Sequence, residues 1–184
     1  ETSGDVYGAD IMQTLYKKYD NKVEFWGIGG PAMMKAGLNQ LEDSNNISVV
    51  GFSEAIKKLP HIAKLLKRIS QFITELNPAD IILIDFPGFN LSLAKKLKKI
   101  NPDQHITYFI SPQIWAWNEG RIKKIKKYIN KMLVIFPFEE LYYKDRDVNA
   151  TYIGHPFLDA WKEQNKNKLK IELGFNTDQI LIGI

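Results

Sequence analysis

Short apolar runs alternate along the chain with longer segments whose apolar residues recur at helical spacing. The run 81–84 consists of four branched apolar residues, a composition typical of a strand buried on both faces in the middle of a parallel sheet. Other strands are expected at 23–28, 105–110, 132–136, 151–153 and 180–184, with helices at 6–19, 52–76, 91–100 and 119–130 between them. This order predicts an α/β fold, a Rossmann-like parallel sheet with helices on both faces.

Two prolines and one polar segment refine the expected positions of helices and connections. Pro31 suits the first turn of a short helix that ends near Met34, because it lacks an amide proton that such a turn leaves unpaired. We expect the polar segment 39–48 to be a connection. Pro60 is expected to divide 52–76 into two helical pieces.

Both ends of the chain are expected to be truncated. The polar stretch Glu1-Thr2-Ser3-Gly4-Asp5 opens a helix, which Ser3 or Asp5 can cap with a side-chain oxygen. Such a loop is half of a strand–loop–helix unit, so the first strand of the sheet is expected to be missing. Residues 1–161 are predicted to form one domain, and 162–184 a lysine-rich connection and first strand leading into an absent second domain.

Composition narrows the class of protein. The chain has 184 residues and 45% hydrophobic content, which is that of a soluble globule. It contains no cysteine, so disulfides and thiolate metal sites are excluded, and its three histidines are scattered. We therefore expect no metal and no cofactor. No apolar run approaches the roughly 18 residues of a membrane span and no leader precedes the first residues, so a cytoplasmic location is expected.

The net charge is only +4, but the basic residues are clustered. The clusters are Lys57, Lys58, Lys64, Lys67 and Arg68; Lys95, Lys96, Lys98 and Lys99; and Lys123, Lys124, Lys126 and Lys127. They form either the solvated faces of amphipathic helices or a surface that attracts phosphates or anionic lipid. Nucleic acid is disfavoured, because aromatic stacking residues are not interleaved with them. Segment 52–76 also has surplus apolar residues, so Ile56, Leu59 and Ile62 are candidates for membrane contact; alternatively they cover the sheet.

Polar residues at the ends of predicted strands are the candidates for chemistry. Asp85 follows the apolar run 81–84, at the carboxyl end where open α/β sheets bind their ligands. The loop 111–117 carries two tryptophans, which either line a sugar or acyl pocket or wedge the loop onto the core. Glu139 suits a helix N-terminus on dipole grounds alone. Histidine side chains can bind phosphate or move a proton, so His155 is a candidate for either role, or it is structural.

Seven motifs occur in a recognisable order. They are Glu1-Thr2-Ser3-Gly4-Asp5, Gly27-Ile28-Gly29-Gly30-Pro31, Val50-Gly51-Phe52 with Glu54, Ile84-Asp85-Phe86-Pro87-Gly88-Phe89-Asn90, Ser111-Pro112-Gln113-Ile114-Trp115-Ala116-Trp117, Phe136-Pro137-Phe138-Glu139 and Gly154-His155-Pro156. Together they resemble the lipid-A-disaccharide synthase family of GT-B glycosyltransferases. The resemblance covers essentially the whole chain.

This resemblance implies a fold, a reaction and a location. The fold would be the N-terminal, acceptor-side half of a GT-B enzyme with two Rossmann domains. The reaction would join UDP-2,3-diacylglucosamine to 2,3-diacylglucosamine 1-phosphate (lipid X), giving the β-1,6-linked disaccharide 1-phosphate and UDP with inversion. Because both substrates carry acyl chains, the protein would be peripheral on the inner face of the inner membrane.

The resemblance also assigns roles to residues. Asp85 matches the family's general base. The resemblance further implies substrate-binding roles for Glu1, Ser3, Gly4, Asp5, Asn90, Gln113, Trp115, Arg121, Glu139 and His155. Gly88 departs from the family, which commonly has a second acidic residue there, so Asp85 is the sole catalytic candidate. The alternatives are a non-catalytic nucleotide- or lipid-binding α/β domain and, less favoured, a flavodoxin-like signalling module.

Overall fold

The computed structural model describes residues 2–47, 52–117, 119–160 and 165–180, with side chains except at 2, 52–59, 117, 160 and 166. It divides into two compact units, Glu1–Gly154 and His155–Ile184. The sequence analysis placed a domain boundary after residue 161, and that boundary stays a prediction. Each unit is described by itself.

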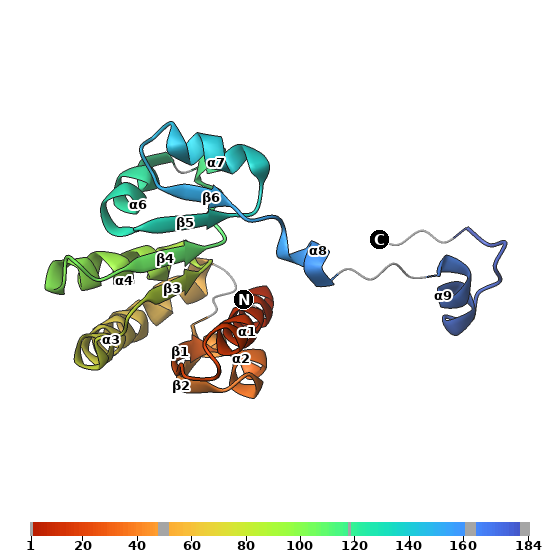
Figure 1. Cartoon of the computed structure of the whole chain (residues 1–184), viewed down its shortest axis with the longest axis horizontal. Helices are drawn as coiled ribbons and strands as arrows, with labels where there is room; N and C mark the ends of the chain where they lie inside the picture. Colours follow the sequence, from red (N-terminus) through yellow and green to blue (C-terminus); the bar gives the residue numbers. More distant parts are fainter. Residues whose placement is uncertain (1, 48–51, 118, 161–164, 181–184) are drawn as a thin grey trace. The chain divides into compact units, whose positions relative to one another are not determined.

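The first unit contains two parallel sheets among its described residues. Strands β3 (Ile81–Ile84), β4 (Ile106–Phe109), β5 (Lys131–Val134) and β6 (Ala150–Tyr152) pair in that order (Figure 1). Strands β1 (Phe25–Gly29) and β2 (Leu38–Asp43) form the second sheet. The predicted parallel pairing is confirmed. All four strands of the larger sheet therefore end at one edge, which we call the carboxyl edge.

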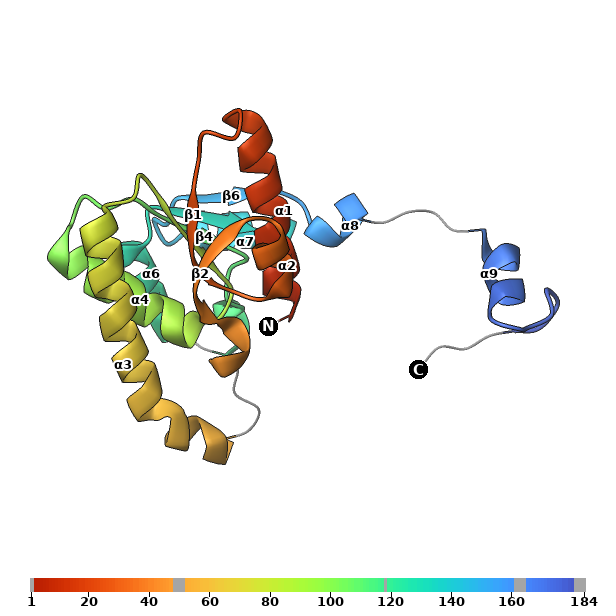
Figure 2. The same cartoon turned by 90° about the horizontal axis from the view of Figure 1, so that it is seen from below.

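Helices lie on both sides of the strands, as predicted. They are α1 (Thr2–Lys18), α2 (Pro31–Lys35), α3 (Phe52–Leu76), α4 (Pro87–Ile100), α5 (Ile114–Trp117), α6 (Ile122–Tyr128) and α7 (Pro137–Lys144), with the 3₁₀ turns η1 (Ser44–Asn46) and η2 (Glu119–Arg121). Figure 2 shows α3, α4 and α6 on one side and α1 and α2 on the other. Helix α4 contacts both α3 and α6. The short helix expected at Pro31 is confirmed.

The prediction that the Asp85 strand is buried on both faces is wrong. Strand β3 is at the edge of the four-stranded sheet, and its residues alternate in burial. Ile81 and Leu83 join the hydrophobic core, whereas Ile82 is 36% exposed. The strand buried on both faces is β4, because it lies between β3 and β5 and all four of its residues are buried.

The segment 39–48 is not simply a connection, because most of β2 lies within it. Its sequence is mostly polar, but the polar side chains find partners in the strand beside it. The Gln40 amide donates to the Gly29 carbonyl at 2.8 Å, and the Asn39 amide donates to the Phe25 carbonyl at 3.1 Å. A polar strand is stable here because its side chains extend the hydrogen bonding between β1 and β2.

The expected division at Pro60 is wrong, because α3 is a single helix of 25 residues that runs through this proline. A proline inside a helix removes one backbone hydrogen bond and clashes with the preceding turn. The buried residues Leu65 and Ile69 anchor the helix to the core beyond that point. Ile62 also packs against the core in part, whereas the side chains of Ile56 and Leu59 lie outside the described residues.

Among the described residues of the second unit are the short helices α8 (Pro156–Ala160) and α9 (Lys166–Glu172). Asn165 caps α9 by accepting from the amides of Asn167 and Lys168. Across the described part of the chain, no helix combines the length and apolar composition needed to cross a bilayer.

Candidate active site

The chain turns sharply where β3 ends. Asp85 and Phe86 both adopt left-handed backbone conformations, with φ of 45° and 40°, and α4 begins at Pro87. Left-handed φ costs a non-glycine residue roughly 1–2 kcal/mol, although aspartate tolerates it better than phenylalanine. Strain of this kind persists only where the surroundings hold the backbone, and it is concentrated at functional sites.

Three groups hold this turn. The Asp85 amide donates to the Phe109 carbonyl at 3.2 Å, extending the pairing with β4 by one residue. The Asp85 carbonyl accepts from the side-chain amide of Asn90 at 2.7 Å and from the Tyr108 hydroxyl. Asn90 donates in addition to the Ile84 carbonyl at 3.0 Å. Asn90, predicted to bind substrate, thus fixes the peptide groups on both sides of the Asp85 Cα.

Tyr108 connects Asp85 electrostatically with Arg121. The tyrosine is fully buried in β4, and this burial, followed by the negative charge of Asp85, raises the pKa of its hydroxyl far above the ordinary value. The positive charge of Arg121 acts on the same hydroxyl in the opposite direction and lowers its pKa. The structure therefore brings Asp85, Asn90 and Arg121 around one tyrosine that the sequence analysis did not single out.

A second cluster follows β4 and β5. Ile110 has a φ of 64°, which is strained for a β-branched residue, and Ser111 comes next and is buried. One carboxylate oxygen of Glu139 accepts from the Ser111 hydroxyl at 2.7 Å and from the Trp115 indole at 3.2 Å. The other accepts from the Phe136 amide at 3.1 Å. Glu139 is only 1% exposed, so its carboxylate supports the two loops.

Aromatic rings are exposed beside this cluster. Trp115 is 39% exposed and meets Phe138 edge-on, with ring centroids 5.0 Å apart. Phe138 stacks on Phe136 at 5.9 Å. The indole nitrogen bonds to Glu139 and thereby fixes the orientation of the ring. Gln113, in the same loop, is exposed. The rings of Trp115 and Phe138 give the carboxyl edge an apolar surface of the kind suited to sugar rings or acyl chains.

The Asp5 carboxylate caps a helix other than its own. It accepts from the amides of Gly30, Ala32 and Met33 at 2.8 to 3.0 Å, which are the first amides of α2. The expectation that Ser3 or Asp5 caps the first helix is wrong, because α1 already begins at Thr2 and the Asp5 side chain bonds across to α2. A Cβ at Gly30 would lie 2.7 Å from the carboxylate, so this close approach requires glycine.

The other predicted substrate-binding residues lie in different parts of the chain. Gly4 faces the end of β3, since a Cβ there would lie 3.7 Å from the Ile84 methyl group, and Ser3 is exposed. Glu1 lies outside the described residues. His155 belongs to the second unit, where its ring accepts from the Phe157 amide at 3.2 Å at the start of α8.

Arg121 lies in the turn η2, which hydrogen bonds tie to the end of α7. It is half-buried at the end of η2, directly before α6. Glu119, in the same turn, accepts from the Arg146 guanidinium at 2.6 Å and from the Tyr142 hydroxyl at 3.2 Å. The hydrogen bond from Arg146 lowers the pKa of Glu119. This surface cluster ties η2 to α7.

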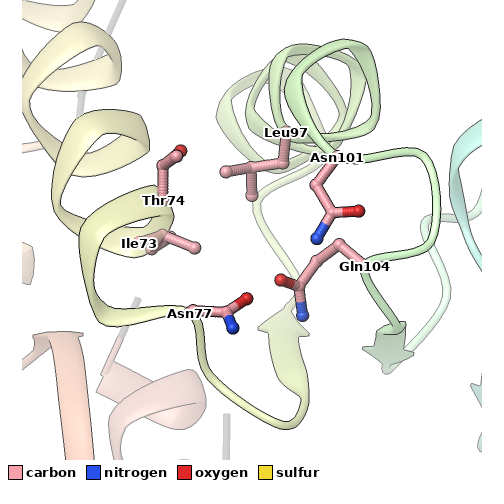
Figure 3. A pocket seen from close by; sticks show the side chains of 6 residues that line it. All are labelled: Ile73, Thr74, Asn77, Leu97, Asn101 and Gln104. Carbon is pink, nitrogen blue, oxygen red and sulfur yellow. The ribbon is translucent and has the colours of Figure 1, made fainter.

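A small cavity lies at the other end of the sheet, between the ends of α3 and α4. It has a volume of about 30 Å³ and is lined by Ile73, Thr74, Asn77, Leu97, Asn101 and Gln104 (Figure 3). It has room for a water molecule or two and polar groups to bind them. Among the described side chains, no three acids or histidines cluster as a metal site requires. None of the residues that line this cavity is a predicted site residue.

Comparisons with known proteins identify relatives over the whole chain. The model of the lipid-A-disaccharide synthetase family matches residues 1–184. A lipid-A-disaccharide synthase of Trichlorobacter lovleyi is 39% identical over 185 aligned positions, 100% of this chain and 48% of that protein. One of Koribacter versatilis is 41% identical over 156 positions, 85% of this chain and 40% of that protein. Lipid-A-disaccharide synthase 2 of Legionella pneumophila is 36% identical, over 100% of this chain and 47% of its own length. The chain spans about half the length of the curated relatives that it matches.

Proposed function

The chain belongs to the lipid-A-disaccharide synthetase family, and from this premise we propose that it is the acceptor-side part of a lipid A glycosyltransferase. The reaction joins UDP-2,3-diacylglucosamine to 2,3-diacylglucosamine 1-phosphate. Its products are the β-1,6-linked disaccharide 1-phosphate and UDP. Residues 1–161 form the acceptor domain, and 162–184 connect it to a domain that holds the donor.

In the proposed mechanism Asp85 is the general base. Its carboxylate takes the proton of the acceptor's 6-hydroxyl while that oxygen attacks the anomeric carbon of the donor. The bond to UDP breaks on the opposite face, so the configuration is inverted and UDP leaves with the electron pair. The observation that carries the proposal is the strained turn, which presents an aspartate at the carboxyl edge of a parallel sheet.

The surrounding residues are proposed to bind the substrates. Arg121 is close enough to act electrostatically on the same tyrosine as Asp85, and its positive charge suits the acceptor phosphate or the departing diphosphate. Trp115 and Gln113 offer an aromatic face and an amide to the sugar. Ser3, Gly4 and His155 are proposed as further contacts, and no cofactor is required.

The test is Asp85→Asn in the complete protein, assayed for disaccharide formation. Loss of a positioned general base lowers the rate by about 10²- to 10⁴-fold. Asp80→Asn is the matched control, because Asp80 immediately precedes β3 at the opposite end of the same strand. Near-normal turnover by Asp85→Asn would contradict the base assignment, whereas absence of disaccharide formation by the unaltered complete protein would favour the non-catalytic binding domain.

A cytoplasmic protein with acylated substrates also needs access to the inner membrane, and we propose that it binds the anionic inner face. Lys95 and Lys99 on α4 and Lys123 and Lys124 on α6 are exposed. Attraction of such clusters to anionic lipid is weakened by salt. Ile56, Leu59 and Ile62 are proposed to add apolar contact, although Ile62 is partly engaged by the core.

Co-sedimentation with anionic liposomes tests this surface. The complete protein is expected to bind at low salt, and Lys95→Glu with Lys99→Glu is expected to reduce binding. Lys17→Glu with Lys18→Glu makes the same change of charge at the end of α1, outside the clusters, and serves as the control. Failure of the unaltered protein to co-sediment at low salt would refute membrane binding.

A further inference from the structure

The backbone of Asp85 is held more firmly than a simple turn requires. Its carbonyl lies beyond the last paired residue of β3 and accepts from two different side chains, Tyr108 and Asn90. Asn90 also bonds the carbonyl of Ile84. Two donors therefore act on one carbonyl, in a residue whose φ of 45° is unfavourable for a side-chain-bearing residue.

The two donors come from different elements. Tyr108 lies in the fully buried β4, and Asn90 lies in the first turn of α4. The Asp85 amide is bonded to β4 as well, through the Phe109 carbonyl. The orientation of Asp85 is therefore fixed relative to both the sheet and the helix, which is what accurate placement of a reacting group requires.

Tyr108 is suited to this role because it remains a donor. Its side chain is fully buried, and this burial together with the charge of Asp85 raises the pKa of its hydroxyl far above the ordinary value. The hydroxyl therefore stays protonated throughout the pH range in which an aspartate can act as a base.

We propose that Tyr108 and Asn90 are positioning residues that clamp the carbonyl of Asp85 and thereby fix its carboxylate for proton transfer. The inference rests on the proposed function, in which Asp85 is the base. Neither residue is assigned contact with the reacting atoms. A misplacement of the base by about 1 Å is enough to lower a rate by about 100-fold.

The experiment is Tyr108→Phe in the complete protein, which removes one hydroxyl and keeps the ring. We expect kcat to fall by about 10- to 100-fold while the KM for the acceptor stays nearly unchanged, because placement of the base is lost and binding is not. In the Asp85→Asn background, the same change is expected to lower the remaining rate no further, because there is no base left to position.

Control variants separate this role from stability. Tyr16→Phe also removes a hydroxyl that donates to a backbone carbonyl, that of Gly37, and should keep normal kcat. If Tyr108→Phe does not fold, Asn90→Asp replaces the other donor with an isosteric acceptor and should show the same selective loss of kcat.

Either of two results would contradict the positioning role of Tyr108 and Asn90 and leave the proposed function intact. One is a normal kcat for folded Tyr108→Phe, or for Asn90→Asp where Tyr108→Phe does not fold, alongside an inactive Asp85→Asn. The other is an equal loss of rate in the Asp85→Asn background. Full activity of Asp85→Asn would instead refute the assignment of Asp85 as the base, and absence of disaccharide formation by the unaltered protein would refute the proposed function.

Discussion

Three carboxylates near the carboxyl edge have different tasks. Asp5 and Glu139 are buried, and each accepts hydrogen bonds from three donors, so both hold loops in place. At Asp85 the bonds from Tyr108 and Asn90 go to the backbone carbonyl. Their full bonding makes Asp5 and Glu139 candidates for support, whereas Asp85 is the candidate for chemistry because a strained turn places it at the carboxyl edge.

Gly88 provides a test at the same scale. It is exposed in the first turn of α4, and a Cβ there would meet no atom within 4 Å, so Gly88→Asp should be accommodated. The variant should gain about 1 kcal/mol of stability in urea unfolding, because aspartate is favoured over glycine at a helix N-terminus. A second negative charge near Asp85 disfavours its ionised form, so the acidic limb of the pH–rate profile should move to higher pH.

Gly88→Asn is the matched control for the charge. It has nearly the same size and should leave the pH–rate profile in place. Identical profiles for the Asp and Asn variants would mean that the charge at position 88 does not influence the group that titrates.

At the scale of secondary-structure elements, the sequence correctly predicted strands with regular apolar runs, but it missed a polar strand and divided a helix that contains proline. The apolar runs correctly located β3, β4 and β5, because each is dominated by residues that favour strands. Strand β2 was missed because its polar side chains bond to β1, which only the paired structure reveals. Helix α3 was wrongly divided because a local rule about proline was overridden by packing on the core.

Pro60→Ala tests that explanation. Since proline is tolerated in α3 at a cost, the replacement should raise the free energy of unfolding, by up to about 3 kcal/mol in a helix interior. Urea unfolding measures the change, and Lys64→Ala at an exposed position of the same helix provides the reference. A loss of stability in Pro60→Ala would indicate that the proline itself makes a needed contact.

At the scale of the whole molecule, two buried tyrosines connect the site with global stability. Tyr108 and Tyr143 are fully buried, and burial is the main cause that raises the pKa of each hydroxyl. Their hydroxyls donate to the backbone carbonyls of Asp85 and Pro112. The folded state therefore retains both protons at a pH where the unfolded chain releases them.

This difference predicts unfolding in alkali. Below about pH 10 both states hold the protons, so the tyrosines add no pH dependence. Above it, the unfolded state alone loses them, and the free energy of unfolding falls by about 1.4 kcal/mol per pH unit for each tyrosine. Urea unfolding across this range should show a shallower fall for Tyr143→Phe. The exposed Tyr19→Phe should keep the original slope, and equal slopes for all three proteins would contradict the prediction.

The sequence by itself determined the α/β class, the parallel pairing, most strand positions and the place of Asp85 at a strand end. These follow from the periodicity of apolar residues, which is a local property of the chain. Only the tertiary structure decided that Asp5 caps α2, that Glu139 is buried and bonds the Trp115 indole, and that Tyr108 holds the Asp85 carbonyl. Hydrogen bonds between residues distant in sequence depend on where the fold brings them, and no local pattern encodes that.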